Sequence, residues 1–191
     1  SGFELFGDSL ISFKHNHLFL ITTAITIFLG SLGYPTLVEY FLSFRRKKSL
    51  FTKINIRLHF LLLFIGMAIF FFLETNNTFS GLSIWEKLSN SLFFSATARN
   101  GGLTTIDVSQ VTITTFLCLT LFMFIGGASS STGGGIRLTT FAVLLSKVLS
   151  VAKSQKEVVI YKKTIAQEAV DKYFMVFFTF MALFFGSTIL L

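Results

Sequence analysis

The chain has 191 residues, of which 52% are hydrophobic and only 13% are charged. Ordinary soluble domains carry about 25% charged residues, so this composition argues against a soluble domain and against a disordered tail. The single cysteine excludes an internal disulfide and a cysteine-based structural zinc site. The formal charge of +7 lies between long apolar runs, which is typical of the cytoplasmic loops of a membrane protein and does not indicate a nucleic-acid partner.

Apolar segments in chain order predict four membrane-spanning helices, one of them broken. A spanning helix needs about 20 mainly apolar residues. We expect Pro35 to kink the first span, because proline removes a helical hydrogen bond. The third span is interrupted by glycines and then resumes. The predicted spans are residues 18–44, 58–73, 111–125 continued by 138–151, and 173–191.

A shorter helix is predicted from Ile84 to Ala98, where apolar residues recur every three or four positions. Its 15 residues would extend about 22 Å, which is less than the roughly 30 Å of a hydrocarbon core. One interpretation is a helix that lies on the membrane surface. The other is a re-entrant pore helix, because a glycine-bearing loop and a new span follow directly.

The distribution of Lys and Arg predicts the orientation. Residues 45–57 contain six of these side chains and residues 137–172 contain seven, whereas acidic residues gather in the opposite segments. Cytoplasmic loops are enriched in Lys and Arg, so we place the loops at 45–57 and 152–169 in the cytoplasm, with the intervening spans crossing twice. The chain starts without Met and stops in an apolar run, so we expect a fragment of a multi-pass plasma-membrane protein.

Two segments are unlike ordinary membrane helix. The first is residues 97–105, where Asn100, Gly101 and Gly102 follow the short helix. Non-helical backbone within a membrane is tolerated only against protein or a water-filled path, and its carbonyl oxygens could replace water around a cation. An ordinary extracellular turn is the alternative, because Asn-Gly-Gly is also common turn chemistry.

The second segment is residues 126–136, which contains five glycines between apolar helices. Each glycine costs about 1 kcal/mol in a helix relative to alanine. A flexible linker or a phosphate-binding loop fits poorly, because a linker would upset the crossing count and the phosphate-loop pattern is absent. We predict a broken transmembrane helix that lines a cavity, with the hydroxyls of residues 129–132 bonding freed backbone groups. Such a loop would be mobile and is therefore a candidate gate.

These motifs resemble the KtrB/TrkH/HKT superfamily of potassium and sodium transport proteins, most closely the bacterial KtrB-type subunit. The resemblance is carried by residues 97–103 and 124–137, with support from residues 1–9 and 30–35, and it runs over essentially the whole chain. It implies an all-α integral membrane protein in which four helix–pore loop–helix repeats surround one ion path. Residues 1–44 would be the end of the second pore loop and its outgoing helix, 45–57 a basic loop, 54–151 the third repeat, 152–169 a connector, and 170–191 the first helix of the fourth repeat.

The resemblance also implies the site residues. The filter would be lined by Asn100, Gly101, Gly102 and Gly2, with K⁺, or Na⁺, held as the transported ion by backbone carbonyls alone. The gate loop would consist of Gly126, Gly127, Ala128, Ser129, Ser130, Ser131, Thr132, Gly133, Gly134, Gly135 and Arg137. The implied partners are a second complete subunit in a homodimer, a cytosolic nucleotide-binding regulatory ring and membrane lipids.

The function predicted from these features is that of a pore-forming subunit for potassium uptake. The alternatives are a sodium-selective member of the same family and a non-conducting membrane anchor or assembly subunit. No nucleophile–base pair indicates an enzyme.

Individual polar residues carry narrower expectations. We expect Arg99 to be hydrogen-bonded behind the filter, and Arg137 either to reach the interface or to hold the loop by its carbonyls. We expect the three histidines, His15, His17 and His59, to be interfacial rather than metal ligands.

Overall fold

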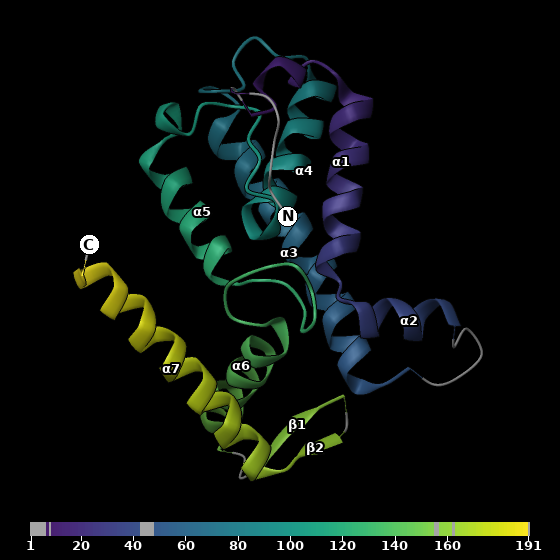
Figure 1. Ribbon diagram of the computed structural model, residues 1–191, viewed down its shortest axis with the longest axis vertical. Helices are drawn as coiled ribbons and strands as arrows, with labels where there is room; N and C mark the ends of the chain where they lie inside the picture. The colour runs from purple at the N-terminus through teal and green to yellow at the C-terminus, as the bar shows by residue number, and fades with distance from the viewer. Residues whose placement is uncertain (1–6, 8, 43–47, 155–156, 162, 191) are drawn as a thin grey trace.

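The computed structural model describes residues 7, 9–42, 48–154, 157–161 and 163–190. The chain is mainly helical, and its helices form an upright group with a second group below it (Figure 1). The elements are η1 (Ile11–Phe13), α1 (His17–Ser31), α2 (Tyr34–Leu42), α3 (Leu50–Glu74), α4 (Ile84–Asn100), η2 (Val108–Gln110), α5 (Ile113–Phe124), α6 (Leu138–Ala152), β1 (Val158–Ile160), β2 (Lys163–Ile165) and α7 (Gln167–Leu190).

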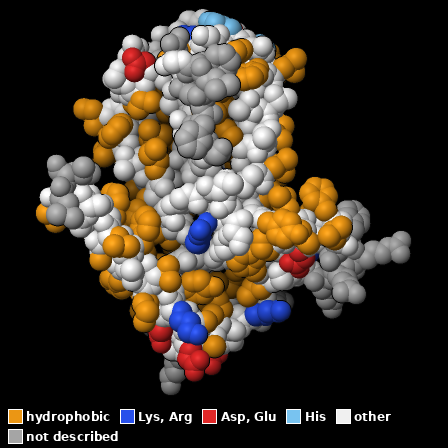
Figure 2. All heavy atoms as spheres, in the orientation of Figure 1, with side chains coloured by type: hydrophobic (Ala, Val, Ile, Leu, Met, Phe, Trp, Pro, Cys, Tyr) orange, Lys and Arg blue, Asp and Glu red, His pale blue; other side chains and the backbone are white. Residues whose placement is uncertain are grey.

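Two of the described helices, α3 and α7, are each long and apolar enough to cross a membrane, and α1 with α2 would add a third span if the bent pair is counted as one. Large apolar side chains on their outer faces are exposed, among them Leu18, Phe72 and Met175. Figure 2 shows hydrophobic side chains over much of the face in view, with most charged side chains toward its lower end. Exposed apolar surface of this extent is typical of a protein whose solvent is lipid.

The first predicted span is not one continuous helix. It breaks between α1 and α2, which are bent by 97°. The break lies at Gly33, whose φ of +77° is a left-handed conformation that glycine adopts readily. The expected kink at Pro35 is therefore wrong: Pro35 is the second residue of α2, where a missing N–H costs no helical hydrogen bond.

The third predicted span is broken as expected. Helix α5 ends at Phe124, and α6 begins at Leu138 after a segment without helix. We call residues 125–137 the glycine-rich loop. In Figure 1 this loop crosses between α5 and α6, below α4.

Helix α4 is at the centre of the upright group and packs against α1, α3 and α5. Phe94 on α4 contacts the ring of Phe70 on α3 edge-on at 4.8 Å between centroids. Gly66 on α3 allows this approach, because a Cβ there would collide with Ser95 Oγ on α4 and would also lie 2.9 Å from the ring of Phe122 on α5. Small residues at helix contacts bring backbones together in this way. The burial of α4 among three helices contrasts with the interpretation of a helix on the outer surface.

The sequence analysis did not predict the hairpin of β1 and β2, in which Val158 pairs with Ile165 in an antiparallel register. Val158 is buried in a small cluster with Val143 and Val170, and so joins the hairpin to α6 and α7. Arg57 Nη1 donates to Tyr161 Oη at 3.3 Å. The start of α3 and the hairpin, which belong to the two basic segments, therefore lie at one end of the molecule.

Candidate functional site

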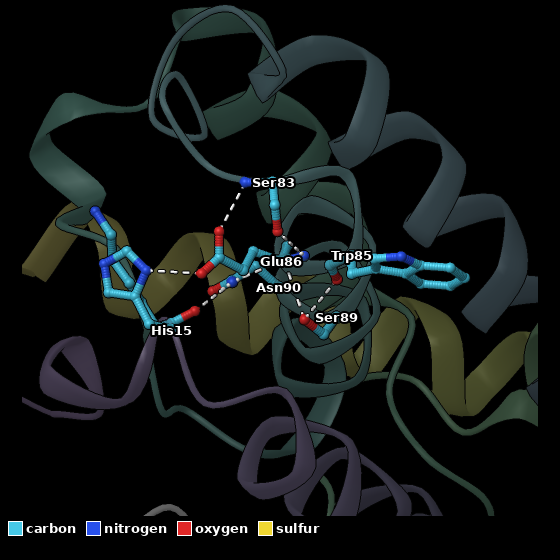
Figure 3. Close-up of polar contacts among 7 residues, drawn as sticks. His15, Ser83, Trp85, Glu86, Ser89 and Asn90 are labelled. Carbon is cyan, nitrogen blue, oxygen red and sulfur yellow. Dashed lines mark hydrogen bonds and ion pairs between the residues drawn. The ribbon is translucent and has the colours of Figure 1, made fainter.

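The entry to α4 is fixed by a capping box. Ser83 Oγ accepts from Glu86 N, and the Glu86 carboxylate accepts from Ser83 N at 2.7 Å (Figure 3). The same carboxylate lies 2.9 Å from His15 Nδ1. The hydrogen bond from His15, followed by that from the Ser83 backbone, lowers the pKa of Glu86 to about 2. Asn90 Nδ2 also donates to the carbonyl of Lys14 at 2.9 Å, so the segment before α1 is fastened to the first turns of α4.

The other end of α4 leads into residues 101–107, which we call the post-α4 loop. Thr97 Oγ1 accepts from Leu103 N at 3.0 Å and donates to Leu103 O at 2.8 Å. Gly102 has a φ of +70°, which a residue with a Cβ rarely adopts. Among the described residues, no hydrogen bond to the carbonyl oxygen of Gly101 or Gly102 is formed. These two carbonyl oxygens are therefore not used by the described part of the chain, and of the two residues Gly102 is exposed and Gly101 is buried.

The N-terminal segment lies beside this loop. Leu10 N donates to Thr104 O at 2.9 Å, and Thr104 N donates to Ser9 Oγ at 2.8 Å. Two segments that the resemblance assigns to two different filter loops are therefore hydrogen-bonded neighbours. Gly2, the predicted filter residue of the other loop, lies outside the described residues.

The glycine-rich loop is closed at its base by backbone hydrogen bonds. Gly126 N donates to Ile136 O at 3.0 Å, and Ile136 N donates to Phe124 O at 2.9 Å, so the two ends of the loop run side by side. A Cβ on Gly126 would overlap the carbonyl oxygen of Gly134 and lie 2.7 Å from its carbon. The close approach of residues 126 and 134 within the loop therefore requires glycine at position 126.

Arg137 organises the centre of the loop. Its Nη1 donates to Ala128 O at 3.2 Å and to Gly133 O at 3.3 Å. Of the two alternatives for this side chain, the structure shows the one in which it binds loop carbonyls. The expected role of the hydroxyls is found only in part: Ser131 Oγ accepts from Gly133 N, Ser129 Oγ bonds Thr139 Oγ1, and Ser130 and Thr132 are exposed.

The loop is also bonded to the bend between α1 and α2. Ala128 N donates to Ser31 O at 3.1 Å, and Tyr34 N donates to Ser130 O at 3.4 Å. A Cβ on Gly33 would lie 2.5 Å from Ser129 O. The neighbour that requires glycine at position 33 is therefore the backbone of the glycine-rich loop.

Asn100 brings the two loops together. A Cβ on Gly133 would overlap Asn100 Oδ1 and lie 2.7 Å from Asn100 Cγ, and a Cβ on Gly127 would lie 3.2 Å from Asn100 Oδ1. Neither Oδ1 nor Nδ2 of Asn100 has a hydrogen-bond partner in the part of the chain that the structure describes, although both atoms are buried. The side chain of Asn100, the last residue of α4, thus packs against Gly127 and Gly133 of the glycine-rich loop.

Two polar side chains near this site differ from expectation. Arg99 is 4% exposed, and its Nε and Nη1 have no partner within the described ranges, so the expected hydrogen bonds are absent at these atoms. His59 was expected at an interface, but it is fully buried and bonds Ser31 Oγ, because α3 extends further toward its N-terminus than the predicted span. No cluster of metal-ligating side chains occurs among the described residues.

The site therefore consists of a helix end, unbonded carbonyls and a second non-helical loop directly below. Sequence reasoning identified both loops, but it missed the residues that fasten them. Thr97 and Ser9 fix the post-α4 loop, and Ser31 holds the glycine-rich loop. Thr97 lay within the motif that was singled out; its position in the last turn of α4 was the available signal.

The chain is similar in sequence and in fold to known cation transport proteins. The family profile described as "TrkH: Cation transport protein" matches residues 1–191. The chain is 37% identical over 195 residues to Ktr system potassium uptake protein D of Bacillus subtilis, covering 100% of this chain and 43% of that protein. It is 33% identical over 177 residues to Ktr system potassium uptake protein B of Vibrio alginolyticus, covering 90% of this chain and 39% of that protein.

A third relative, the potassium/sodium uptake protein NtpJ of Enterococcus hirae, is 31% identical over 185 residues, covering 96% of this chain and 41% of that protein. The fold matches the crystal structure of the potassium transporter TrkH from Vibrio parahaemolyticus with a TM-score of 0.76 and 18% identity, covering 92% of this chain and 39% of that one. The chain therefore spans about two fifths of the length of the relatives that it matches.

Proposed function

This chain belongs to the TrkH family of cation transport proteins, which are transporters and not enzymes, and from that premise we propose that it forms part of the pore of a potassium uptake protein. The names of the relatives support K⁺ as the transported ion, and one relative is named as a potassium/sodium uptake protein. We propose that residues 54–151 are one complete helix–pore loop–helix repeat. Residues 1–44 would then end the preceding repeat, and residues 170–191 would begin the next.

The observation that carries the proposal is the post-α4 loop with its unbonded carbonyls. A cation in a filter loses its hydration shell, so oxygen atoms of the protein must replace that water. The carbonyl oxygens of Gly101 and Gly102 form no hydrogen bond among the described residues, and Thr97 holds the following backbone. Asn100, Gly101 and Gly102 would therefore contribute filter oxygens, and Gly2 would do so from the neighbouring segment.

The glycine-rich loop is the proposed gate. It lies against the end of α4, because a Cβ added at Gly127 or at Gly133 would closely approach or overlap the side chain of Asn100. A loop in this position would block an ion that leaves the filter until it moves aside. Arg137 would hold the closed form through the carbonyls of Ala128 and Gly133.

We further propose that the complete protein is a multi-pass plasma-membrane protein and that two copies form a homodimer on a cytosolic nucleotide-binding ring. The loops at 45–57 and 152–169 would face the cytoplasm, where they could meet the ring or anionic lipid headgroups. In the described part of 45–57, Lys48 Nζ lies 3.6 Å from the centre of the Tyr40 ring. Neutralising Lys47 and Lys48 should weaken co-purification with the ring; unchanged co-purification would contradict the docking proposal.

The test of conduction is ion flux through the complete parent protein in liposomes, with K⁺ and Na⁺ compared. Gly102→Val should abolish uptake, because valine at a φ of +70° would distort the filter backbone. Gly81→Val is the matched control: Gly81 has a φ of +83°, and a Cβ there meets no atom within 4 Å. It imposes similar backbone strain in a distant turn and should leave flux per folded protein unchanged.

Three outcomes would contradict the proposal or a part of it. If the wild-type parent carried neither ion, the chain would belong to a non-conducting anchor or assembly subunit. If Gly102→Val conducted as well as Gly81→Val, the post-α4 loop would not be the filter. Faster flux of Na⁺ than of K⁺ would favour the sodium-selective alternative.

A further inference from the structure

We propose that the side chain of Asn100 and the backbone of Gly133 form the contact that couples the filter to the gate, with the Asn100 amide setting the balance between closed and open loop. The inference rests on the proposed function and adds to it a role for a side chain. Asn100 was predicted to act through its carbonyl oxygen alone. Its amide group, however, faces the glycine-rich loop.

The contact is sterically specific. The Asn100 amide occupies the space that a Cβ would need at Gly133, and it lies close to the corresponding space at Gly127. A Cβ on the next residue, Gly134, would meet no atom within 4 Å. With the Asn100 side chain in this position, residue 133 must therefore lack a Cβ, whereas residue 134 carries no such requirement.

The contact is also electrostatically unfavourable. Both polar atoms of the Asn100 amide are buried, and neither has a hydrogen-bond partner among the described residues. A buried amide without partners is destabilised relative to a hydrated one. Withdrawal of the loop would let water reach this amide, so its desolvation favours opening. The hydrogen bonds that the loop forms with Arg137, with Ser31 O and with Tyr34 N oppose opening, because they hold the loop in place.

Asn100 is thus a positioning residue with two opposite effects. Its side-chain volume contacts the loop, and the cost of burying its unpaired amide group limits the stability of the closed state. The two effects can be separated by substitution, because one depends on volume and the other on polarity.

The steric part is tested in the complete parent protein, reconstituted in liposomes, by comparing Gly133→Ala with Gly134→Ala. Alanine at 133 should prevent the loop from seating and raise resting K⁺ flux by about tenfold, which corresponds to about 1.4 kcal/mol in the closed-to-open balance. Alanine at 134, where a Cβ would meet no atom within 4 Å, should raise resting flux much less than alanine at 133. The double variant Gly133→Ala with Asn100→Ala should restore low resting flux, because the overlapping amide is gone.

The polar part is tested with Asn100→Leu and Asn100→Asp, whose side chains have the same number of heavy atoms as asparagine and the same branch point at Cγ. Leucine should lower flux, because the closed state no longer buries an unpaired amide. Aspartate should raise resting flux, because closure would bury a charge. The ratio of K⁺ to Na⁺ flux should stay that of the wild type with leucine, since the filter carbonyls are unchanged. A changed ratio with leucine would place the side chain in the filter and overturn the inference.

A cross-link provides a readout that does not depend on flux alone. In a Cys118→Ser background, Asn100→Cys with Gly133→Cys should form a disulfide that stops flux until a reductant is added, and Asn100→Cys with Gly134→Cys should form it less. Equal flux in Gly133→Ala and Gly134→Ala, with a conducting wild type, would overturn the coupling while leaving the proposed function intact. A wild type without flux would overturn both.

Discussion

Thr97 Oγ1 bonds both backbone groups of Leu103, accepting from its N–H at 3.0 Å and donating to its carbonyl at 2.8 Å. One hydroxyl thus fixes the backbone on both sides of Leu103, the residue that follows Gly102, and so sets the direction in which the post-α4 loop leaves the helix. The loop owes its shape to this side chain as well as to its glycines.

Thr97→Val should therefore make the backbone of the proposed filter less rigid without changing any residue that lines it. Valine has the shape of threonine but leaves the Leu103 N–H unpaired, which costs about 1 kcal/mol for this half-buried group. We expect a lower ratio of K⁺ to Na⁺ flux in liposomes containing the complete parent. Thr97→Ser keeps the hydroxyl and is expected to keep the ratio; an unchanged ratio in Thr97→Val would show that this bond does not shape the filter.

The membrane helices were largely predictable because the bilayer imposes a length and a composition that a sequence shows directly. Helices α3 and α7 match apolar runs in this way. The short α4 was predictable from its apolar spacing, and the pair Ser83 and Glu86 marks its start. The break between α5 and α6 followed from the density of glycines.

Other features depended on contacts between residues far apart in the chain. The bend at Gly33 is held by the loop around Ser130, and an apolar run gives no sign of a change in direction. The contact of Asn100 with Gly133 joins two motifs that the sequence presents separately. The hairpin at 158–165 was missed because its strands have three residues each, too few for an alternating pattern.

Glu74 joins the end of α3 to the start of α5, and its removal should destabilise the fold. The carboxylate is fully buried and accepts from Asn77, Thr78 and Thr112. Glu74→Gln replaces one acceptor oxygen by a donor, so at least one of these groups loses its partner at a cost of about 2 kcal/mol.

Thermal unfolding of the complete parent in detergent would measure this loss. Glu168→Gln is the control, because Glu168 is exposed on α7 and should change stability by less than about 0.5 kcal/mol. Equal melting temperatures for the two variants would show that the Glu74 hydrogen bonds contribute no net stability.

Glu86 should make stability depend on pH in the acidic range. Its pKa is lowered from the ordinary 4.5 to about 2, chiefly by the hydrogen bond from His15. A carboxyl whose pKa is lower in the folded state stabilises the fold fully above its ordinary pKa, and the contribution is lost as pH falls toward the folded value. Melting temperature should therefore decline between about pH 4.5 and about pH 2, and Glu86→Gln should show a smaller decline. Parallel curves for the two proteins would contradict this assignment.

Gly33 sets the direction of α2 and seats the glycine-rich loop, so Gly33→Ala should impair both stability and gating. Its φ of +77° disfavours any side chain, at a cost of about 1–2 kcal/mol, and a Cβ there would also lie 2.5 Å from Ser129 O. Gly30 in the last turns of α1 is the matched control, because a Cβ there would meet only Thr132 Oγ1, at 4.0 Å.

Gly33→Ala is expected to lower the melting temperature and to raise resting K⁺ flux, because the displaced carbonyl of Ser129 carries the loop with it. Gly30→Ala should be neutral or slightly stabilising, since alanine favours a helix by about 1 kcal/mol over glycine. A Gly33→Ala protein that melts earlier but keeps wild-type resting flux would separate the bend from the gate. The loop would then depend on Arg137 and the Ser31 carbonyl, which bind it without any contribution from residue 33.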